Sequence, residues 1–300
     1  MSWRVVVISS NSKLDYKMNY LVVRNAETTK RIHISEISVL LIESTAVSLT
    51  SYLLWELSKQ KVSVIFCDEK RCPAGSFLPL YGSHDTSLKF RKQIKWDDYT
   101  KQFVWSEIVR AKINGQLAVL RHFEKENCGL LEQYTKEIEP GDTTNREGHA
   151  AKVYFNSLFG MDFSRSQDNN INAALNYGYS ILLSDFAREI VSSGYATQIG
   201  IFHDNMFNSF NLACDLMEPF RPFVDFMVVT MDLSQFGHLE KMDLVNILNK
   251  QINIDGRVQY LLNAVKIYTK SIFEALSEND ISKIRFPDYE LQIYENDIVF

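Results

Sequence analysis

The first 80 residues alternate between short apolar runs and polar stretches, which is typical of β-structure. Strands are expected over residues 5–8, 20–24, 30–34, 39–42 and 62–66. The polar stretch 25–29 fits the turn of a hairpin. Residues 47–58 carry leucines at helical spacing, so one helix is expected there. Pro73, Gly75 and Pro79 then interrupt the pattern, which predicts a domain boundary near residue 80.

From about residue 96 the apolar spacing becomes helical, and residues 103–120 predict one or two long helices. Further helices are expected over 147–159, 171–192, 209–218, 240–250 and 256–277. The pattern therefore predicts an α+β chain. A β-rich domain occupies 1–80, a basic connector 81–95, and a larger, mainly α-helical domain 96–300.

Composition narrows the class of protein without identifying it. The chain has 46% hydrophobic and 23% charged residues, which is ordinary globular composition. No apolar run approaches the roughly 20 residues needed to span a bilayer, and the first residues do not fit a signal peptide. The four cysteines form no Cys-x-x-Cys pair. A disulfide framework or zinc knuckle is therefore not expected, and a prokaryotic, reducing cytoplasm without membrane contact is the predicted location.

The charged residues argue both against and for nucleic-acid binding. The formal net charge of −5 argues against an extensive phosphate-binding surface. Four basic residues nevertheless lie within seven positions, at Lys89, Arg91, Lys92 and Lys95. This run fits a local basic stripe or an ordinary solvated face, and the pattern alone does not choose between them.

Glu147 has two interpretations. Thr144 precedes it by three residues, which fits a capping box in which the carboxylate returns to the backbone. Glu147 is also in helical register with Ala151, Tyr154 and Leu158, a face expected to be buried. A carboxylate on such a face needs a cation, a metal or strong donors, because burying it unpaired costs several kcal/mol.

His203 and Glu218 complete a candidate metal site. His203 ends the apolar stretch 199–202, where its ring can lie at a pocket rim or form a hydrogen-bonded part of the core. Asp215 and Glu218 share one helix face, either as metal-binding acids or as an ion-pair cluster with Arg221. Glu147, His203 and Glu218 together offer two carboxylates and one imidazole, a set that suits Mg²⁺ or Mn²⁺ better than a thiolate-bound metal.

Four motifs, in order, resemble those of a known family. They are Glu-Gly-His-Ala-Ala-Lys-Val-Tyr-Phe from residue 147, Asn-Ala-Ala-Leu-Asn-Tyr-Gly-Tyr-Ser-Ile-Leu from 172, Gly-Ile-Phe-His from 200, and Asp-Leu-Met-Glu-Pro-Phe-Arg-Pro from 215. The chain resembles, over essentially its whole length, the CRISPR-associated integrase and endonuclease of the spacer-adaptation module, the Cas1 family. It looks most similar to the type II members.

The resemblance implies a small N-terminal β-sandwich domain for dimerisation or partner contact, followed by an α-helical catalytic domain. It implies a homodimer that joins a small second adaptation subunit and holds double-stranded DNA. The family's ligand positions fall on Glu147, His203 and Glu218, where many relatives carry Asp in the last position. Asp215 would lie behind these ligands. The basic residues nearest to them in sequence, and thus candidate DNA contacts, are Arg146, Lys152 and Arg221.

The implied reaction is the metal-dependent insertion of short foreign DNA into a CRISPR array, in which a 3′-hydroxyl attacks a phosphodiester. Three alternatives remain open. A metal nuclease for branched or repair DNA would cleave without joining, and a DNA-binding scaffold would do no chemistry. In the third alternative the same Glu, His and acidic pair are only structural parts of a two-domain protein. The match of all four motifs would then have to be accidental.

Overall fold

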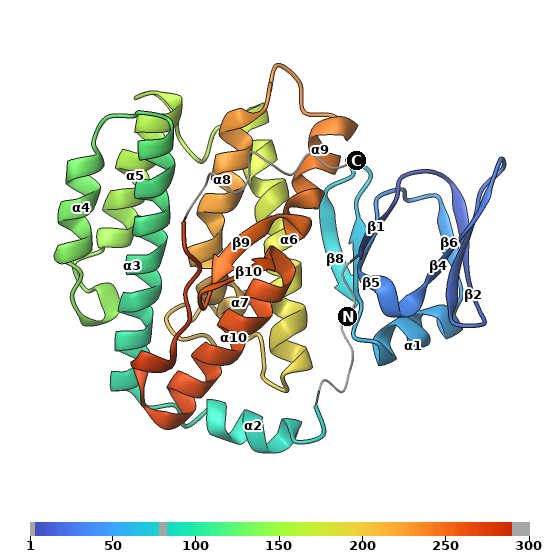
Figure 1. Cartoon of the computed structure of the whole chain (residues 1–300), viewed down its shortest axis with the longest axis horizontal. Helices are drawn as coiled ribbons and strands as arrows, with labels where there is room; N and C mark the ends of the chain where they lie inside the picture. Colours follow the sequence, from blue (N-terminus) through green and yellow to red (C-terminus); the bar gives the residue numbers. More distant parts are fainter. Residues whose placement is uncertain (1–3, 78–82, 290–300) are drawn as a thin grey trace. The chain divides into compact units, whose positions relative to one another are not determined.

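The computed structural model describes residues 4–77 and 83–289 and divides into two compact units (Figure 1). Unit 1 comprises Met1–Thr86 with Val191–Gly194, and unit 2 comprises Ser87–Ile190 with Tyr195–Phe300. The division falls inside the segment 81–95 that the sequence analysis treats as a connector, and part of that segment forms helix α2 (Thr86–Gln93). Residues 78–82 of the predicted boundary lie outside the described residues.

Unit 1 contains two four-stranded sheets. The first has the order β1-β5-β7-β8, formed by β1 (Arg4–Ile8), β5 (Ile37–Ile42), β7 (Ser63–Cys67) and β8 (Pro73–Phe77). Its first three strands are parallel, and β8 is antiparallel to β7. The second has the order β4-β3-β2-β6, formed by β4 (Thr29–His33), β3 (Tyr20–Arg24), β2 (Ser12–Lys17) and β6 (Val47–Leu49).

Both sheets contribute side chains to one core, which confirms the predicted small β-domain. Leu14 and Leu21 come from the second sheet and Leu40 from the first, and Leu53 of helix α1 (Ser51–Lys59) joins them. All four side chains are fully buried. Residues from different strands that share one dry core hold the two sheets together as a sandwich.

Two predictions for this unit need correction. The helix expected over 47–58 is preceded by strand β6 and begins only at Ser51, because the Thr50 side chain accepts a hydrogen bond from Leu53 N and caps the helix there. Pro73 and Gly75 were expected to break the chain, but they lie in strand β8 at the edge of its sheet. An edge strand tolerates proline because one side of its backbone needs no strand partner.

Unit 2 is mainly helical, as predicted (Figure 1). Besides α2, its helices are α3 (Asp98–His122), α4 (Cys128–Lys136), α5 (Arg146–Phe159), α6 (Asn170–Ser192), α7 (Asn211–Met217), α8 (Arg221–Thr230), α9 (His238–Val245) and α10 (Leu261–Glu278). Short 3₁₀ turns include η2 (Pro140–Asp142) and η3 (Glu218–Phe220). Within residues 4–77 and 83–289, no helix is long and apolar enough to cross a membrane.

Helix α3 is the central element of this unit. Asp97 caps its first turn by accepting a hydrogen bond from Thr100 N. Along its 25 residues it packs against α4, α5, α8, α10, η2 and η3, and it buries side chains on most of its circumference. A helix surrounded in this way brings its own residues close to several segments that lie far apart in sequence.

The helix predicted over 256–277 begins later than expected. Residues Arg257–Tyr260 form strand β10, which pairs antiparallel with β9 (Gln251–Ile254). Asp255 and Gly256 both have positive φ, as a two-residue hairpin turn of the Asp-Gly type requires. This turn pairs the strands, so α10 starts only at Leu261.

Candidate active site

The start of helix α5 positions Glu147. Asn145 is the N-cap and accepts a hydrogen bond from Gly148 N. The carboxylate of Asp142 accepts from Arg146 N at 2.8 Å and from Glu147 N at 3.0 Å. Since these side chains satisfy the first free N–H groups of the helix, the capping box predicted for Thr144 and Glu147 is wrong. The Glu147 carboxylate is thereby free to point away from its own backbone.

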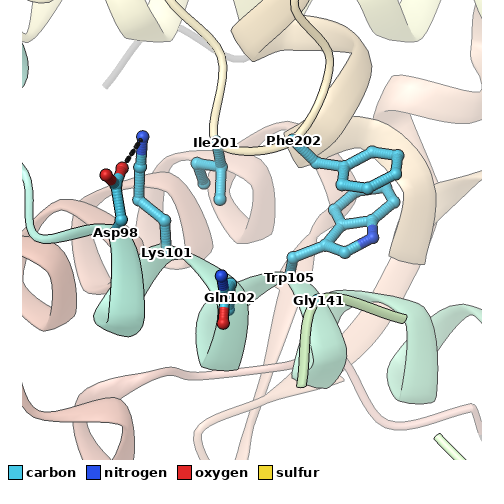
Figure 2. Close-up of a pocket in the computed structure, with 7 residues that line it drawn as sticks. All are labelled: Asp98, Lys101, Gln102, Trp105, Gly141, Ile201 and Phe202. Atoms are coloured by element: carbon cyan, nitrogen blue, oxygen red, sulfur yellow. Dashed lines mark ion pairs between the residues drawn. The ribbon is translucent and has the colours of Figure 1, made fainter. Parts of the chain in front are cut away.

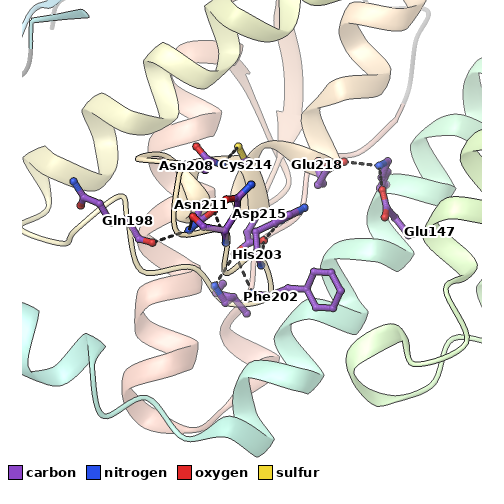
Figure 3. A network of polar contacts seen from close by, with 12 residues as sticks. Glu147, Gln198, Phe202, His203, Asn208, Asn211, Cys214, Asp215 and Glu218 are labelled. Carbon is purple, nitrogen blue, oxygen red and sulfur yellow. Dashed lines mark hydrogen bonds and ion pairs between the residues drawn. The ribbon is translucent and has the colours of Figure 1, made fainter. Parts of the chain in front are cut away.

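Glu147 instead faces Glu218 across a buried lysine. Lys112 Nζ on α3 forms an ion pair and a hydrogen bond with Glu147 Oε1, and it lies 2.5 Å from Glu218 Oε2 on η3. Figure 3 labels the two glutamates. The Lys112 side chain is 8% exposed and that of Glu218 is 5% exposed. The Glu147 side chain is 28% exposed rather than buried, and of the partners considered for it (a cation, a metal or strong donors) this structure shows a cation, the Lys112 ammonium group.

A second cationic side chain, that of Arg221, contacts Glu218. Arg221 Nε donates a hydrogen bond of 2.8 Å to Glu218 Oε1, at the junction where Pro219 and Pro222 separate α7, η3 and α8. Burial, the largest influence, acts to raise the pKa of the Glu218 carboxyl, but the charges of Arg221 and Lys112 lower it below its ordinary value. Glu218 is therefore held as a carboxylate in the protein interior.

Asp215 organises the loop that carries His203. Its Oδ2 accepts hydrogen bonds from Ile201 N at 2.6 Å and Phe202 N at 3.1 Å. Its Oδ1 accepts one from His203 N at 3.1 Å and lies 2.5 Å from the ring nitrogen His203 Nδ1. Gly200 allows this close approach, because a Cβ at that position would meet His203 O at 2.3 Å and Asp215 Oδ2 at 2.7 Å.

The contact with Asp215 also determines which ring nitrogen of His203 is available. The hydrogen bond with Asp215 raises the pKa of His203, and the charges of Asp215, Glu218 and Glu147 act in the same direction. With Nδ1 directed at Asp215, the other ring nitrogen, Nε2, is left to bind a ligand, as in many metal-bound histidines.

A cavity of about 250 Å³ lies beside this loop (Figure 2). It is lined by Asp98, Lys101, Gln102, Trp105, Gly141, Ile201 and Phe202. Phe202 is half exposed and stacks in parallel on Trp105, with ring centroids 4.4 Å apart, while the His203 ring meets Trp105 edge-on at 5.7 Å. His203 thus follows directly on two cavity-lining residues, in keeping with its predicted place at a pocket rim.

The predicted ligands fit a divalent ion chemically, although their present arrangement does not form a cage. Among residues 4–77 and 83–289, no three His, Cys, Asp or Glu side chains are gathered as a ready metal site. The donors are nevertheless of the right kind, two carboxylates and one imidazole nitrogen. The Glu218 side chain is enclosed, and its Oε2 is met by Lys112 Nζ at 2.5 Å, so a metal ion could use this oxygen only in place of the ammonium.

The three predicted DNA contacts have different surroundings. Arg146 pairs with Glu137 at 3.1 Å, and Lys152 is exposed on α5. The guanidinium of Arg221 lies 4.5 Å from the centre of the Tyr179 ring, besides its bond to Glu218. DNA contact by these residues stays a prediction.

Sequence reasoning missed three residues that shape the site: Lys112, Asp142 and Asn211. The Asn211 amide nitrogen donates to Gln198 O and Asn205 O, both at 3.0 Å, and closes the base of the His203 loop. Lys112 could have been singled out, because it lies on α3 at helical spacing from the buried Ile108, Val109 and Gly115, where an unpaired charge is not expected.

Comparisons with known proteins agree with the motifs. The family model for CRISPR associated protein Cas1 matches residues 5–235. A CRISPR-associated endonuclease Cas1 from Neisseria meningitidis is 31% identical over 297 residues, which is 96% of this chain and 97% of that protein.

Two solved structures share the fold. A casposase bound to integration product superposes with a TM-score of 0.76 at 19% identity, covering 94% of this chain and 92% of the other. A Cas6-RT-Cas1–Cas2 complex gives a TM-score of 0.70 at 15% identity, covering 94% of this chain and 36% of that longer one. The family match and the full-length similarity lead to one conclusion: the chain belongs to the Cas1 family of CRISPR-associated proteins, the family predicted from its motifs.

Proposed function

We propose that this chain is a metal-dependent DNA integrase and endonuclease that inserts short foreign DNA into a CRISPR array. Membership of the Cas1 family makes it a DNA-processing enzyme of spacer acquisition. The observation that carries the catalytic proposal is that Glu147 and Glu218, from separate elements, meet at one ammonium group, while Asp215, three residues before Glu218, holds His203. Divalent metal use follows from the enzyme class, and Mg²⁺ or Mn²⁺ is the choice that the donor set favours.

Each site residue would have a defined task. Glu147, Glu218 and His203 Nε2 would hold the metal ion, which when bound polarises the scissile phosphodiester and favours ionisation of the attacking 3′-hydroxyl. Asp215 would keep Nδ1 of His203 engaged, so that Nε2 stays directed at the ion. The cavity lined by Trp105 and Phe202 lies next to this loop and leaves room for part of a substrate.

The proposed assembly is a homodimer with a small second adaptation subunit and double-stranded DNA. A solved relative of the same fold is a complex that contains Cas2, and another is bound to an integration product. These similarities support the same kind of assembly for the present chain. The proposal also gives unit 1 a role in dimerisation or partner contact. A cytoplasmic location stays a prediction.

A strand-transfer assay tests the proposed reaction. The protein is combined with the second adaptation subunit, a short duplex with 3′-hydroxyl ends and a plasmid bearing a CRISPR repeat, with and without EDTA. We expect covalent joining that disappears with EDTA, with Glu147→Gln and with His203→Ala. Glu274→Gln, a partly exposed carboxylate on α10, is the matched control and should join DNA normally.

The other outcomes favour other functions. Cleavage without joining would indicate a nuclease for branched or repair DNA. DNA binding without metal-dependent chemistry would indicate a scaffold. Normal joining by Glu147→Gln would refute the assignment of the site.

A further inference from the structure

Lys112 lies at the place where the ion of the proposed function would have to bind. Its ammonium contacts Glu147 Oε1 and lies 2.5 Å from Glu218 Oε2, so one cation bridges the two carboxylates. Mg²⁺ binds oxygen at about 2.1 Å. An ion that bridges these two oxygens would therefore lie at the position of Nζ or directly beside it.

Each of the two glutamates already has a cationic side chain in direct contact. Glu147 and Glu218 contribute two negative charges, and Lys112 and Arg221 contribute two positive ones. The charge of Asp215 is met separately, by three backbone N–H groups and the His203 ring. Adding a divalent ion while Lys112 stays in place would bring two further positive charges against a buried ammonium group, which is strongly unfavourable.

The fold explains why an internal cation is needed. The two glutamates come from α5 and η3, which pack on the same helix α3. Without a cation between them, two carboxylates at this distance would repel each other in a poorly solvated interior. Lys112, from α3 itself, contacts both carboxylates and offsets this repulsion in the folded protein.

We infer that the Lys112 ammonium occupies the position of the catalytic metal ion in the metal-free protein. There it holds Glu147 and Glu218 together, and it must be displaced when the ion binds. This inference rests on the proposed function, because it concerns the same metal site. Lys112 is thus a positioning residue that competes with the metal. The free energy needed to displace its ammonium lowers the affinity of the site for the ion.

Mn²⁺ binding to the full-length protein tests the inference without measuring activity. Free Mn²⁺ is followed by electron paramagnetic resonance during titration of wild type and Lys112→Met, a variant of similar length without charge. We expect Lys112→Met to bind Mn²⁺ at least about tenfold more tightly, because no ammonium has to be displaced. Its unfolding midpoint should be lower than that of wild type in EDTA and should rise more on addition of Mn²⁺.

Lys270→Met, which removes an exposed lysine of α10, is the matched control and should bind like wild type. Unchanged or weaker Mn²⁺ binding by folded Lys112→Met would overturn the inference, because Lys112 would then help to build the metal site. If Lys112→Met does not fold, Mn²⁺ binding by Lys112→Arg tests the inference instead. Its forked guanidinium binds carboxylates more firmly, so weaker Mn²⁺ binding is expected, and equal or tighter binding would refute displacement.

The two proposals can fail separately. Absence of Mn²⁺ binding in wild type and all variants would refute the metal-dependent function together with the inference. Binding by wild type that is abolished by His203→Ala, but not tightened by Lys112→Met, would leave the function standing and overturn the role of Lys112 alone.

Discussion

Asp225 should make the stability of this protein fall as the pH rises. It is a fully buried carboxyl of α8 that accepts a hydrogen bond from the Tyr179 hydroxyl. Burial, the largest influence, raises the pKa of Asp225 from 3.8 to about 6, against the opposing effects of its hydrogen-bond donors and of Arg221. Because the folded state then binds this proton more tightly than the unfolded state, the stabilising contribution is present below about pH 4 and is lost as pH rises to about 6.

The magnitude follows from the size of the shift. A difference of about two pKa units corresponds to about 3 kcal/mol of unfolding free energy, at 1.36 kcal/mol per unit. Between pH 4.5 and pH 8, roughly 2 kcal/mol of this should be observable. In Asp225→Asn the group cannot ionise, while the amide oxygen can still accept the Tyr179 hydrogen bond, so this component of the pH dependence should disappear.

Urea unfolding in EDTA, from pH 4.5 to pH 8, measures the effect. The free energy of wild type relative to Asp225→Asn should decrease by about 2 kcal/mol over this range, with most of the decrease below pH 6. Asp168→Asn, at an exposed position, controls for general effects of removing a carboxylate. A difference that stays constant with pH, or that grows with pH, would show that Asp225 is not a buried, protonatable acid.

Three further substitutions test the surroundings of the site. Gly178→Ala should lower the unfolding free energy by about 1–3 kcal/mol, because a Cβ would lie 2.5 Å from Val224 Cγ1 between α6 and α8; urea unfolding measures this. Asp215→Asn should cost roughly 3 kcal/mol and abolish strand transfer, since an amide cannot accept all the N–H bonds of the loop. Asp142→Ala should cost about 1–2 kcal/mol in a thermal or urea melt and reduce strand transfer, because Glu147 loses its anchored helix start.

Each of these has an outcome that would contradict it. Gly129→Ala, where nothing lies within 4 Å of the added methyl, is the control for Gly178 and should be neutral or stabilising; equal losses at both positions would rule out the steric argument. Wild-type integration by Asp215→Asn would mean that the loop does not depend on its carboxylate. An unaltered melting curve for Asp142→Ala would mean that Asn145 alone suffices as the cap of α5.

The sequence was most informative where local pattern and chemistry coincide. The β-rich first unit, the helical second unit and the family could be predicted from periodicity and motifs. Pro219 and Pro222 are a further local signal, because proline lacks the N–H that a continuous helix needs, and both lie at the start of a new helical segment, η3 and α8. Even a missed hairpin had a local signal, since Asp255-Gly256 is the preferred dipeptide of its turn.

The partners of the candidate ligands could not be predicted in this way, because they depend on contacts between distant segments. Glu147 fitted a capping box by spacing alone, but Asp142 reaches the same helix start from η2 and displaces that arrangement. Lys112 is 35 residues from Glu147 in sequence, and no periodicity predicts that they meet. Asp215 and Glu218 were placed on one face, yet one organises the His203 loop and the other binds Lys112 and Arg221.

The stacking of Phe202 on Trp105 has an optical consequence. Indole emission depends on the groups around the ring, and Trp105 is buried against both Phe202 and the neighbouring imidazole. The described residues contain two other tryptophans, of which Trp55 is exposed in unit 1 and Trp96 packs on Tyr195 and Phe273 instead. A shift of the His203 loop would separate the stacked rings and alter the emission of one tryptophan, so the protein carries its own fluorescent reporter of the state of that loop.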